Sequence, residues 1–493
     1  MRKALAAGCL LAALLAGCRG PAVTFPAMSV DSAAREAGAW TAYDTDQDHR
    51  ADFYHFVGPQ GWVRRLGYDL DGDGQIDELI DLDLLDNRHC RHLVIILDGF
   101  SYDLVRRYWE EGGLRVLRPP SIVVSPYPTM TDASLEDLLD YTPCEGFEAK
   151  FYDRRRHRMV GGAMAYLHGF NQPYNQLLDY RANIIWDVVG YVSPRPVFGR
   201  ELNHVKRQFD RASSQEMLAY LVSTAGMSTR HGAAGQQECL RDIERLVNQV
   251  IWQTRGLTRV TLLSDHGHTY TQASRLDLES YLKDRGWTVT EKPKGQGRKE
   301  VVPLRFGLVN YAGFVTDRRA ELAKDLAENP HVLLASYADG DHVVVLAGNG
   351  QQAIVDRCGD RFSYQAISGD PLQLAPLLPR LQADEKGFYD SQQLLEATAD
   401  HIYPDPLYRL WRAHLGLVHT PPDVIISLDK EHCYGLESFA RRVDIASTHG
   451  SLERCSSLAM AMTNAGPLPP VMRSDQLPAA LGNLVGWPWP ARR

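Results

Sequence analysis

Short apolar runs recur along the chain and form its clearest pattern. Four of them are "HLVIILDGF" from His92, "PSIVVSPYPT" from Pro120, "RVTLLSDHG" from Arg259 and "PDVIISLD" from Pro422. Their uninterrupted, largely β-branched character is typical of strands that are buried on both faces of a sheet. Helical stretches such as residues 238–252 lie between them. The pattern therefore predicts an α/β fold over residues 92–493, with a mainly parallel sheet sandwiched by helices.

The order of elements changes between residues 301 and 367. This stretch contains "RFGLVNYAGFV", the helical "DRRAELAKDLAENP", then "HVLLASY" and "HVVVLAG". Strands and a helix in this order predict a small α+β insertion between strands of the main sheet. The basic run over residues 292–299 that precedes it is expected to be an exposed, solvated loop.

Two acidic stretches lie near the start of the chain, "YDTDQDHRADFYHF" from Tyr43 and "YDLDGDGQIDELID" from Tyr68. Each has Asp at its first, third, fifth and ninth loop positions. Hard cations such as Ca²⁺ take several oxygen ligands from one tight loop. Gly74 permits the sharp turn in the second loop, whereas His49 replaces it in the first, which is therefore expected to bind less well. The candidate ligands are Asp44, Asp46, Asp48 and Asp52, then Asp69, Asp71, Asp73, Gln75 and Asp77.

These loops resemble the calcium loops of EF-hands and of bacterial Asp-rich repeats. They lack the bidentate Glu at position twelve, where His55 and Ile80 stand. The residues between them alternate around a Gly-Pro-Gln-Gly turn, which predicts a β-hairpin. We expect structural calcium sites in an N-terminal region over residues 18–91. The alternative is a pair of solvated acidic loops without metal.

The chain begins with "MRKALAAGCLLAALLAGC", which reads as a targeting signal. Arg2 and Lys3 precede an apolar segment that is too short to span a bilayer. Residues 15–18, Leu-Ala-Gly-Cys, resemble a bacterial lipobox, which implies removal of residues 1–17 and lipid attachment, such as palmitate, to Cys18. The alternative is an ordinary secretory signal. We therefore expect a lipoprotein on the membrane of a bacterial cell envelope, outside the cytoplasm, on the periplasmic or outer-membrane side.

Composition narrows the classes of function. The chain has 493 residues, 44% hydrophobic and 23% charged, with a net charge of −8 that becomes −10 without Arg2 and Lys3. A nucleic-acid-binding protein is expected to be basic, so none is predicted here. Besides Cys9 and Cys18 the chain has six cysteines, Cys90, Cys144, Cys239, Cys358, Cys433 and Cys455. An even number in an oxidising compartment favours disulfides, with the pairing open.

Polar residues that can carry chemistry follow several of the predicted strands. Asp98 ends the first, Thr131 follows the second at the start of a helix, Asp265 and His266 end the third, and His449 stands in "STHGSL". Taken singly, each is a helix cap or a polar turn. In α/β sheets, however, ligands bind where strands end, and an Asp-His pair is a good donor set for a metal. Together these residues predict one site.

The set resembles the type I phosphodiesterase/nucleotide pyrophosphatase branch of the alkaline phosphatase superfamily. The motif match extends over about residues 92–485, and "YPTMT" is close to the branch's Tyr-Pro-Thr-x-Thr. This resemblance implies an alkaline phosphatase-like fold with Thr131 as nucleophile. It assigns Asp98, Thr131, Asp265 and His266 to one metal, usually zinc, and His449 to a second. No Cys-x-Pro-x-Arg occurs at the nucleophile position, which argues against the sulfatase branch.

The resemblance also implies a reaction. A threonine hydroxyl is a weak nucleophile that a bound metal activates. Attack by Thr131 on phosphorus would give a phosphothreonine, which water would then hydrolyse. The expected substrate is a phosphate diester or monoester of a small molecule, a lipid or a nucleotide. Residues 169–180, "GFNQPYNQLLDY", are expected to line its pocket, with Asn171 or Asn175 as a phosphate-oxygen donor.

One part of the family's pattern is missing. The second metal normally takes an Asp and a His from an Asp-x-x-x-His segment, but Ala225 and Thr229 stand at these positions in "LVSTAGMSTRHGAAG". His231 is the nearest substitute, and His268 is either a substrate contact or exposed. Two alternatives to a hydrolase therefore remain: a non-catalytic surface protein that binds phosphate esters, or a transferase of a phosphoryl or phospho-head group.

Overall fold

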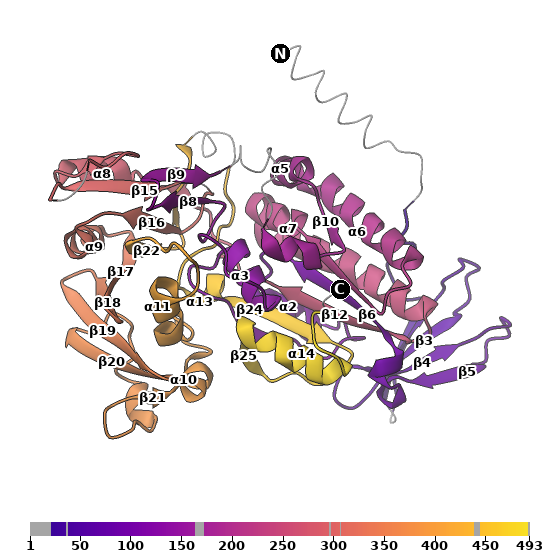
Figure 1. The fold of residues 1–493 in the computed structure, drawn as a ribbon. Helices are drawn as coiled ribbons and strands as arrows, with labels where there is room; N and C mark the ends of the chain where they lie inside the picture. The colour runs from indigo at the N-terminus through magenta and orange to yellow at the C-terminus, as the bar shows by residue number, and fades with distance from the viewer. Residues whose placement is uncertain are drawn as a thin grey trace, which may run out of the picture.

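The computed structural model describes residues 21–35, 38–162, 172–294, 297–305, 307–437 and 444–491. Residues 1–17 and Cys18, on which the lipoprotein interpretation depends, lie outside this range. Figure 1 shows a central sheet covered by helices, a second sheet at one end and a small sheet at the other. Among the described residues no helix is long and apolar enough to cross a membrane.

The central sheet has seven strands in the order β10-β11-β6-β12-β24-β7-β25. Strand β24 is antiparallel to both of its neighbours, and every other adjacent pair is parallel. The predicted mainly parallel sheet is therefore confirmed. Its strands are β10 (Tyr180–Arg181), β11 (Glu216–Leu221), β6 (Arg91–Leu97), β12 (Thr258–Ser264), β24 (Leu458–Thr463), β7 (Ser121–Val124) and β25 (Val471–Arg473).

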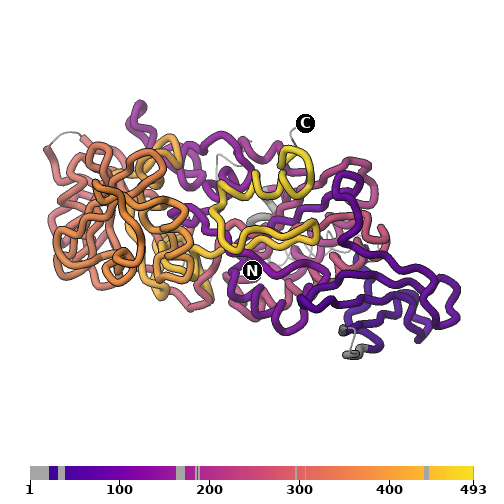
Figure 2. The backbone as a smooth tube through the Cα atoms, turned by 90° about the horizontal axis from the view of Figure 1, so that it is seen from below, coloured from indigo at the N-terminus to yellow at the C-terminus, as the bar shows by residue number. Residues whose placement is uncertain are grey.

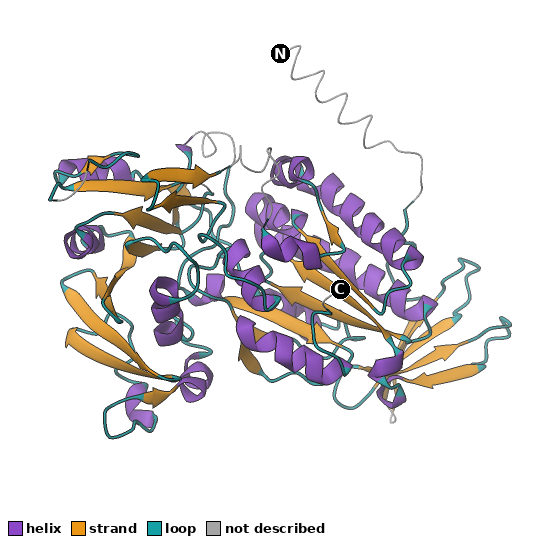
Figure 3. Ribbon diagram, viewed as in Figure 1, coloured by secondary structure: helices purple, strands orange, loops and turns teal. Residues whose placement is uncertain are grey.

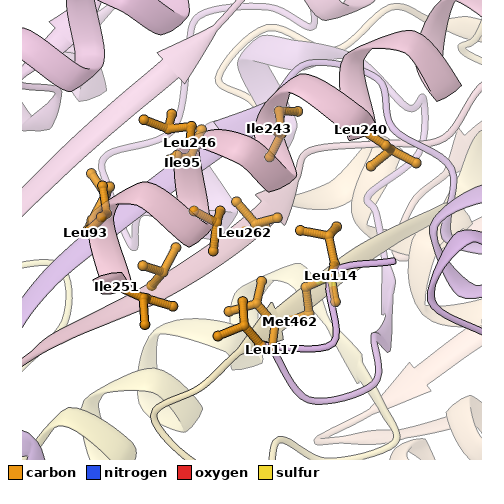
Figure 4. Packing of buried hydrophobic residues seen from close by; sticks show 14 of the residues in the cluster. Leu93, Ile95, Leu114, Leu117, Leu240, Ile243, Leu246, Ile251, Leu262 and Met462 are labelled. Carbon is orange, nitrogen blue, oxygen red and sulfur yellow. The ribbon is translucent and has the colours of Figure 1, made fainter. Parts of the chain in front are cut away.

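Helices bury both faces of this sheet, as Figure 3 shows. Alternate residues of β6 point to opposite faces. Leu93 and Ile95 pack in one apolar cluster with residues of α7, seen in Figure 4, whereas Val94 and Ile96 join residues of α3 and α14 in another. The helices around the sheet are α2 (Tyr102–Glu110), α3 (Thr131–Leu138), α5 (Ile184–Val192), α6 (Pro194–Arg211), α7 (Ser223–Gln253), α13 (Arg454–Ser457) and α14 (Leu477–Val485).

The second sheet has nine strands in the order β14-β15-β16-β22-β17-β18-β19-β20-β21. All adjacent pairs are antiparallel except β14 with β15. Its strands are β14 (Thr288–Val289), β15 (Glu300–Leu304), β16 (Tyr311–Val315), β22 (Val424–Leu428), β17 (Val332–Asp339), β18 (His342–Ala347), β19 (Gln351–Cys358), β20 (Arg361–Ser368) and β21 (Tyr389–Asp390). Helices α8 (Leu278–Asp284), α9 (Arg319–Ala327), α10 (Ser391–Thr398) and α11 (Pro406–Leu415) accompany it.

The sequence predicts that "PDVIISLD" is a strand of the main sheet, and this prediction is wrong. This run forms β22, which pairs with β16 and β17 in the second sheet. All five residues of β22 are buried, so its apolar pattern is the same as that of a main-sheet strand. The second sheet thus draws on residues beyond the 301–367 stretch in which an insertion was predicted.

The N-terminal region forms a five-stranded antiparallel sheet in sequence order. Strands β3 and β4 form the predicted hairpin. Figure 2 shows this sheet and the second sheet at opposite ends of the molecule. The strands are β1 (Asp31–Arg35), β2 (Gly38–Tyr43), β3 (Phe53–Val57), β4 (Val63–Tyr68) and β5 (Glu78–Asp81), and two further small sheets pair β8 (Lys150–Asp153) with β9 (Arg158–Gly161) and β13 (Ser274–Arg275) with β23 (His432–Cys433).

The expectation of disulfides is wrong for this structure. All six cysteines of the described part are free thiols, and most are buried. Cys144, for example, is 1% exposed and packs in the apolar cluster beside α3. A buried thiol behaves as a small apolar side chain, so cysteine count alone did not reveal its role.

Candidate active site

The register of two parallel strands brings the two key carboxylates together. Leu97 of β6 lies opposite Ser264 of β12, so Asp98 and Asp265 leave the sheet at the same level. The backbone N–H of Gly99 then donates to Asp265 Oδ1 over 2.8 Å. Both carboxylates are buried, with exposed fractions of 2% and 0%. The carboxyl edge of the sheet thus holds two acidic groups that are both buried.

His266 completes a group of three side chains that can hold a metal ion. Its Nε2 lies 3.6 Å from Asp98 Oδ1 and 3.5 Å from Asp265 Oδ2. One ligand atom from each of the three residues lies within 4.8 Å of the others. Two carboxylate oxygens and an imidazole nitrogen are a donor set that suits zinc and related divalent cations.

Thr131 is the first residue of α3, as the sequence predicted. Its Oγ1 lies 3.5 Å from His266 Nε2, and the residue is half-buried while the carboxylates are fully enclosed. The first turn of a helix presents free N–H groups and the positive end of the helix dipole, which favour an anion. The hydroxyl is therefore the accessible member of the set, at a position suited to a phosphate group.

His449 stacks on His266, with ring centroids 3.9 Å apart and planes 14° apart. Its Nδ1 lies 2.9 Å from the Thr129 carbonyl, which fixes the ring beside the Thr131 turn. The second sheet supports this loop, because Asn310, just before β16, donates its N–H to the His449 carbonyl over 2.8 Å. His449 therefore lies at the junction between the two large sheets, as part of the same site.

Of the two roles that the sequence left open for His268, exposure is wrong. His268 is wholly buried, and it forms a second group of possible metal ligands with His266 and His449. The signal was present in "DHGH", since residues two apart in an extended segment point to the same side. Gly267 between them permits a close approach, because a Cβ there would lie 2.2 Å from the Cys455 carbonyl oxygen.

Burial sets the protonation states of the site. Desolvation lowers the pKa of His266 to about 4 and that of His449 to about 3, and it holds the pKa of His268 well below its usual value. Burial also raises the pKa of Asp265 to about 6, against the lowering effect of the Gly99 N–H. Neutral imidazoles near pH 7 offer nitrogen lone pairs for a metal rather than a positive charge.

Helix α7 adds no residue to the two groups of possible metal ligands around His266. His231 Nε2 lies 3.1 Å from a guanidinium nitrogen of Arg195, which in turn binds Glu238 at 2.9 Å. Within the described ranges, His231 belongs to none of the groups that can hold a metal. Ala225 is a buried apolar residue, and the Thr229 carbonyl accepts the N–H of Ala446. The structure thus leaves His231 outside the site.

Several polar residues that the sequence did not reveal position the site. Tyr220 of β11 donates its hydroxyl to Asp98 Oδ2 over 2.5 Å. Thr224 Oγ1 donates to the Asp98 carbonyl over 2.8 Å, and Gln236 Nε2 donates to the Gly99 carbonyl over 2.5 Å. No sequence motif marks these residues, because their role depends on the distance between β11, α7 and β6 in space.

The predicted pocket segment lies partly outside the described residues, which exclude Asn171. Asn175 lies in a 3-10 turn, η3 (Pro173–Leu177), and is half-buried. Its neighbours contact helix α3: Tyr174 Oη and Gln172 Nε2 each donate to Asp132 over 2.6 Å. The segment therefore packs against the first turn of α3, and its role as a pocket lining stays a prediction.

The two Asp-rich loops adopt the same backbone shape. In the second loop Gly72 and Gly74 have φ of 75° and 86°, and in the first Gln47 and His49 have φ of 69° and 72°. One carboxylate in each loop accepts two backbone N–H groups: Asp44 from Gln47 and His49, Asp69 from Gly72 and Gly74. The residues that come within ligand range of one another are Asp44, Asp46 and Asp48 in the first loop and Asp69, Asp71 and Asp77 in the second.

The remaining candidate ligands of the loops form hydrogen bonds within their own loops. Asp52 accepts the N–H and the hydroxyl of Thr45. Asp73 accepts the N–H of Gln75 over 2.8 Å and its side-chain amide over 3.2 Å. Asp52 and Asp73 are therefore outside the two carboxylate groups.

No family model matches this chain, and no curated protein matches it. Solved structures similar to it include murine ectonucleotide pyrophosphatase/phosphodiesterase 5, in an inactive form in complex with AMP, at 12% identity and a TM-score of 0.44, over 82% of this chain and 97% of that one. The human protein of the same name matches at 11% identity and a TM-score of 0.42, over 80% of this chain and 95% of that one.

Proposed function

We propose that this chain is a metal-dependent phosphoesterase that uses Thr131 as its nucleophile. The observation that supports this proposal is the convergence of Thr131 Oγ1 on His266 Nε2, at 3.5 Å, beside the buried Asp98 and Asp265. A hydroxyl at a helix start, next to two carboxylates and an imidazole, suits attack on a phosphate ester. A diester is favoured over a monoester by the Tyr-Pro-Thr-x-Thr resemblance.

The residues fit a divalent cation. Two buried carboxylates side by side repel each other unless a cation or a proton lies between them. His266 does not supply that charge, because burial lowers its pKa to about 4. Asp98, Asp265 and His266 would hold a zinc ion, which would lower the pKa of the Thr131 hydroxyl and neutralise charge on the phosphoryl oxygens.

The chain's own groups define the rest of the reaction. Thr131 Oγ1 forms a bond to phosphorus while the bond to the leaving alcohol breaks, and the proton of the hydroxyl leaves with that alcohol. The first turn of α3 offers backbone N–H groups to the phosphoryl oxygens. Water then attacks phosphorus in the phosphothreonine, the bond between phosphorus and Thr131 Oγ1 breaks, and the phosphoryl group leaves as a phosphate product while a proton of the water restores the hydroxyl. The half-buried Thr131 and His449 mark the side from which substrate and water enter.

The decisive experiment compares the protein with its Thr131→Ala variant. Metal content is measured by elemental analysis, and hydrolysis is followed with a chromogenic diester and a chromogenic monoester. The variant is expected to lose activity roughly 10³-fold or more while it keeps its metal. Thr290→Ala is the matched control, since this hydroxyl lies near β14, where it accepts the Lys292 N–H. Equal turnover by the wild type and Thr131→Ala would sink the proposal.

The same measurements test the two alternatives. A binding protein would keep its metal and show no turnover of either ester. A transferase would release the chromophore only when an acceptor alcohol is present. Both outcomes differ from hydrolysis in water alone, which the proposal requires.

We further propose structural calcium in the Asp-rich loops and lipid anchoring at Cys18. Calcium in the second loop is supported by the shared loop shape and by the carboxylate groups. Anchoring is supported by the leader sequence, and mass spectrometry of the mature N-terminus tests it. A chain whose mature N-terminus lacks a lipid-modified Cys18 would contradict anchoring.

A further inference from the structure

Three imidazoles lie close together beside the carboxylates, and only one of them belongs to the carboxylate group that can hold a metal. His266, His268 and His449 place ligand nitrogens within 4.8 Å of one another. His266 Nε2 faces Asp98 and Asp265, so it belongs to the carboxylate group. His268 and His449 remain, with ring centroids 5.1 Å apart. The family resemblance assigns His449 to a second metal, whereas His268 has no role in the proposed reaction so far.

Nδ1 of each of the three rings already has a hydrogen-bond partner. Nδ1 of His266 and of His449 lies 2.9 Å from a backbone carbonyl, which requires the proton on that nitrogen and leaves Nε2 as a lone pair. Nδ1 of His268 lies 2.9 Å from Ser447 Oγ, which also accepts the Tyr270 N–H. Metal-ligating histidines are oriented in this way by bonds to the opposite nitrogen.

His268 Nε2 has no hydrogen-bond partner among the described residues, although the side chain is 0% exposed. A buried polar atom without a partner is uncommon in folded proteins, and this one lies beside two other imidazoles that can bind a metal. The backbone makes room for this atom. Gly99 has φ of 68°, and a Cβ there would lie 2.7 Å from His268 Nε2 and 2.5 Å from Cδ2. A glycine therefore separates Asp98 from the ring and leaves space beside the carboxylates.

We propose that His268 and His449 hold a second divalent transition-metal ion beside the first, in place of the Asp and His that α7 lacks. Two nitrogen ligands favour zinc, cobalt or nickel over magnesium or calcium. Water or a phosphoryl oxygen would occupy the remaining positions. This inference deepens the proposed function, because a second cation would lie on the side of the site where water enters.

The test is cobalt binding to the full-length protein, measured by metal analysis and visible absorption. The background carries His331→Asn and His432→Asn, because these partly buried histidines form another possible metal group with Asp429. His268→Asn is the key variant: its amide can still bond Ser447 but offers no atom at the Nε2 position. His55→Asn is the matched control, since His55 is also buried with an unbonded Nε2, in the N-terminal sheet.

The background protein and His55→Asn are expected to bind two cobalt ions per chain at the proposed centre. His268→Asn should bind one, with the affinity for the second reduced at least about 10-fold. Asp98→Asn with Asp265→Asn should instead lose the other ion. Circular dichroism and thermal unfolding of the metal-free variants check that they fold. Equal cobalt binding by His268→Asn and the background, or a single ion in both, would overturn the inference.

These outcomes are independent of hydrolysis. If Thr131→Ala retains full activity, or if no ester is hydrolysed, the proposed function fails. The second ion at His268 would still be established by the loss of one cobalt in His268→Asn. Conversely, if the protein hydrolyses the esters but His268→Asn binds cobalt as the background does, the proposed function stands and the second metal site is ruled out.

Discussion

Thr131 Oγ1 lies 3.5 Å from His266 Nε2, although 135 positions separate the two residues in the chain. One residue begins α3 and the other follows β12, and both elements meet at the carboxyl edge of the main sheet. Arg412 of α11 holds α3 from the other side, with two bonds of 2.8 Å to Asp137. The Thr131 hydroxyl, the proposed nucleophile, thus begins a helix that lies between the two large sheets (Figure 1).

Gly99→Ala is expected to damage the metal centre and the fold together. The new methyl group would lie 2.5 Å from the His268 ring, at a φ of 68° that L-residues rarely adopt. We expect a loss of roughly 1–3 kcal/mol in the free energy of unfolding and weaker cobalt binding. Denaturant unfolding and cobalt titration measure the two effects.

Gly286→Ala separates backbone strain from the steric clash. Gly286 has φ of 80°, but a Cβ there would meet no atom within 4 Å. This variant should lose stability by a similar backbone effect and bind cobalt normally. Normal cobalt binding by Gly99→Ala as well would contradict the close approach of Gly99 and His268.

Much of the main sheet could be predicted from the sequence. Strands buried on both faces are continuous apolar runs, so β6, β7 and β12 were visible without a structure. Sheet membership was not, since β22 has the same pattern and pairs elsewhere. Periodicity reports burial and local conformation, whereas partner choice depends on contacts between distant segments.

The residues of the candidate site also differ in how far the sequence reveals them. Asp98, Thr131 and His266 stand in short motifs that follow strands, and the structure brings them together. His268 was visible only as a neighbour of the Asp-His pair, because its burial depends on packing against Ser447, 179 positions away. Tyr220 could not be recognised from the sequence, because it stands within an apolar run like any other residue of a buried strand. Its role depends on the pairing of β11 with β6.

Tyr220→Phe is expected to weaken metal binding at the carboxylate group without unfolding the protein. The hydroxyl donates to Asp98 Oδ2 over 2.5 Å and so orients that carboxylate. Loss of such a partner typically reduces metal affinity by about 10- to 100-fold. Zinc affinity by competition with a chromogenic chelator gives the result. Tyr152→Phe is the control, a buried tyrosine whose hydroxyl has no hydrogen-bond partner among the described residues; identical affinities for both variants would exclude the role of Tyr220.

His49→Gly in the first Asp-rich loop is expected to tighten calcium binding about 5-fold. His49 has φ of 72°, where the second loop has Gly74 at 86°. A non-glycine residue in this region costs roughly 1 kcal/mol, which corresponds to about a fivefold change in affinity. Gly74→His is the reciprocal variant and should weaken the second loop by a similar factor. Calorimetric titration with calcium measures both, and unchanged affinity in the reciprocal pair would show that loop strain does not control binding.

The last prediction concerns the pH dependence of stability through Glu136 in α3. Burial raises the pKa of Glu136 to about 8, and the nearby Asp137 adds to the shift, although the Cys144 N–H and Arg412 oppose it. The ordinary value of 4.5 applies in the unfolded chain. Between these values the folded protein binds a proton that the unfolded chain has lost. The stability from this group is therefore complete below pH 4.5 and is lost as pH rises through 8.

Glu136→Gln removes this titration and keeps a side-chain oxygen to accept the Cys144 N–H. The wild type is expected to lose roughly 1–4 kcal/mol of unfolding free energy between pH 5 and pH 9 through this group, and the variant should lose less by that amount. Denaturant unfolding across the pH range gives the two profiles. Glu238→Gln, on the exposed side of α7, should retain the wild-type profile. Parallel profiles for the wild type and Glu136→Gln would mean that the Glu136 carboxyl reaches solvent and ionises normally, so that α3 is less tightly enclosed than its contacts indicate.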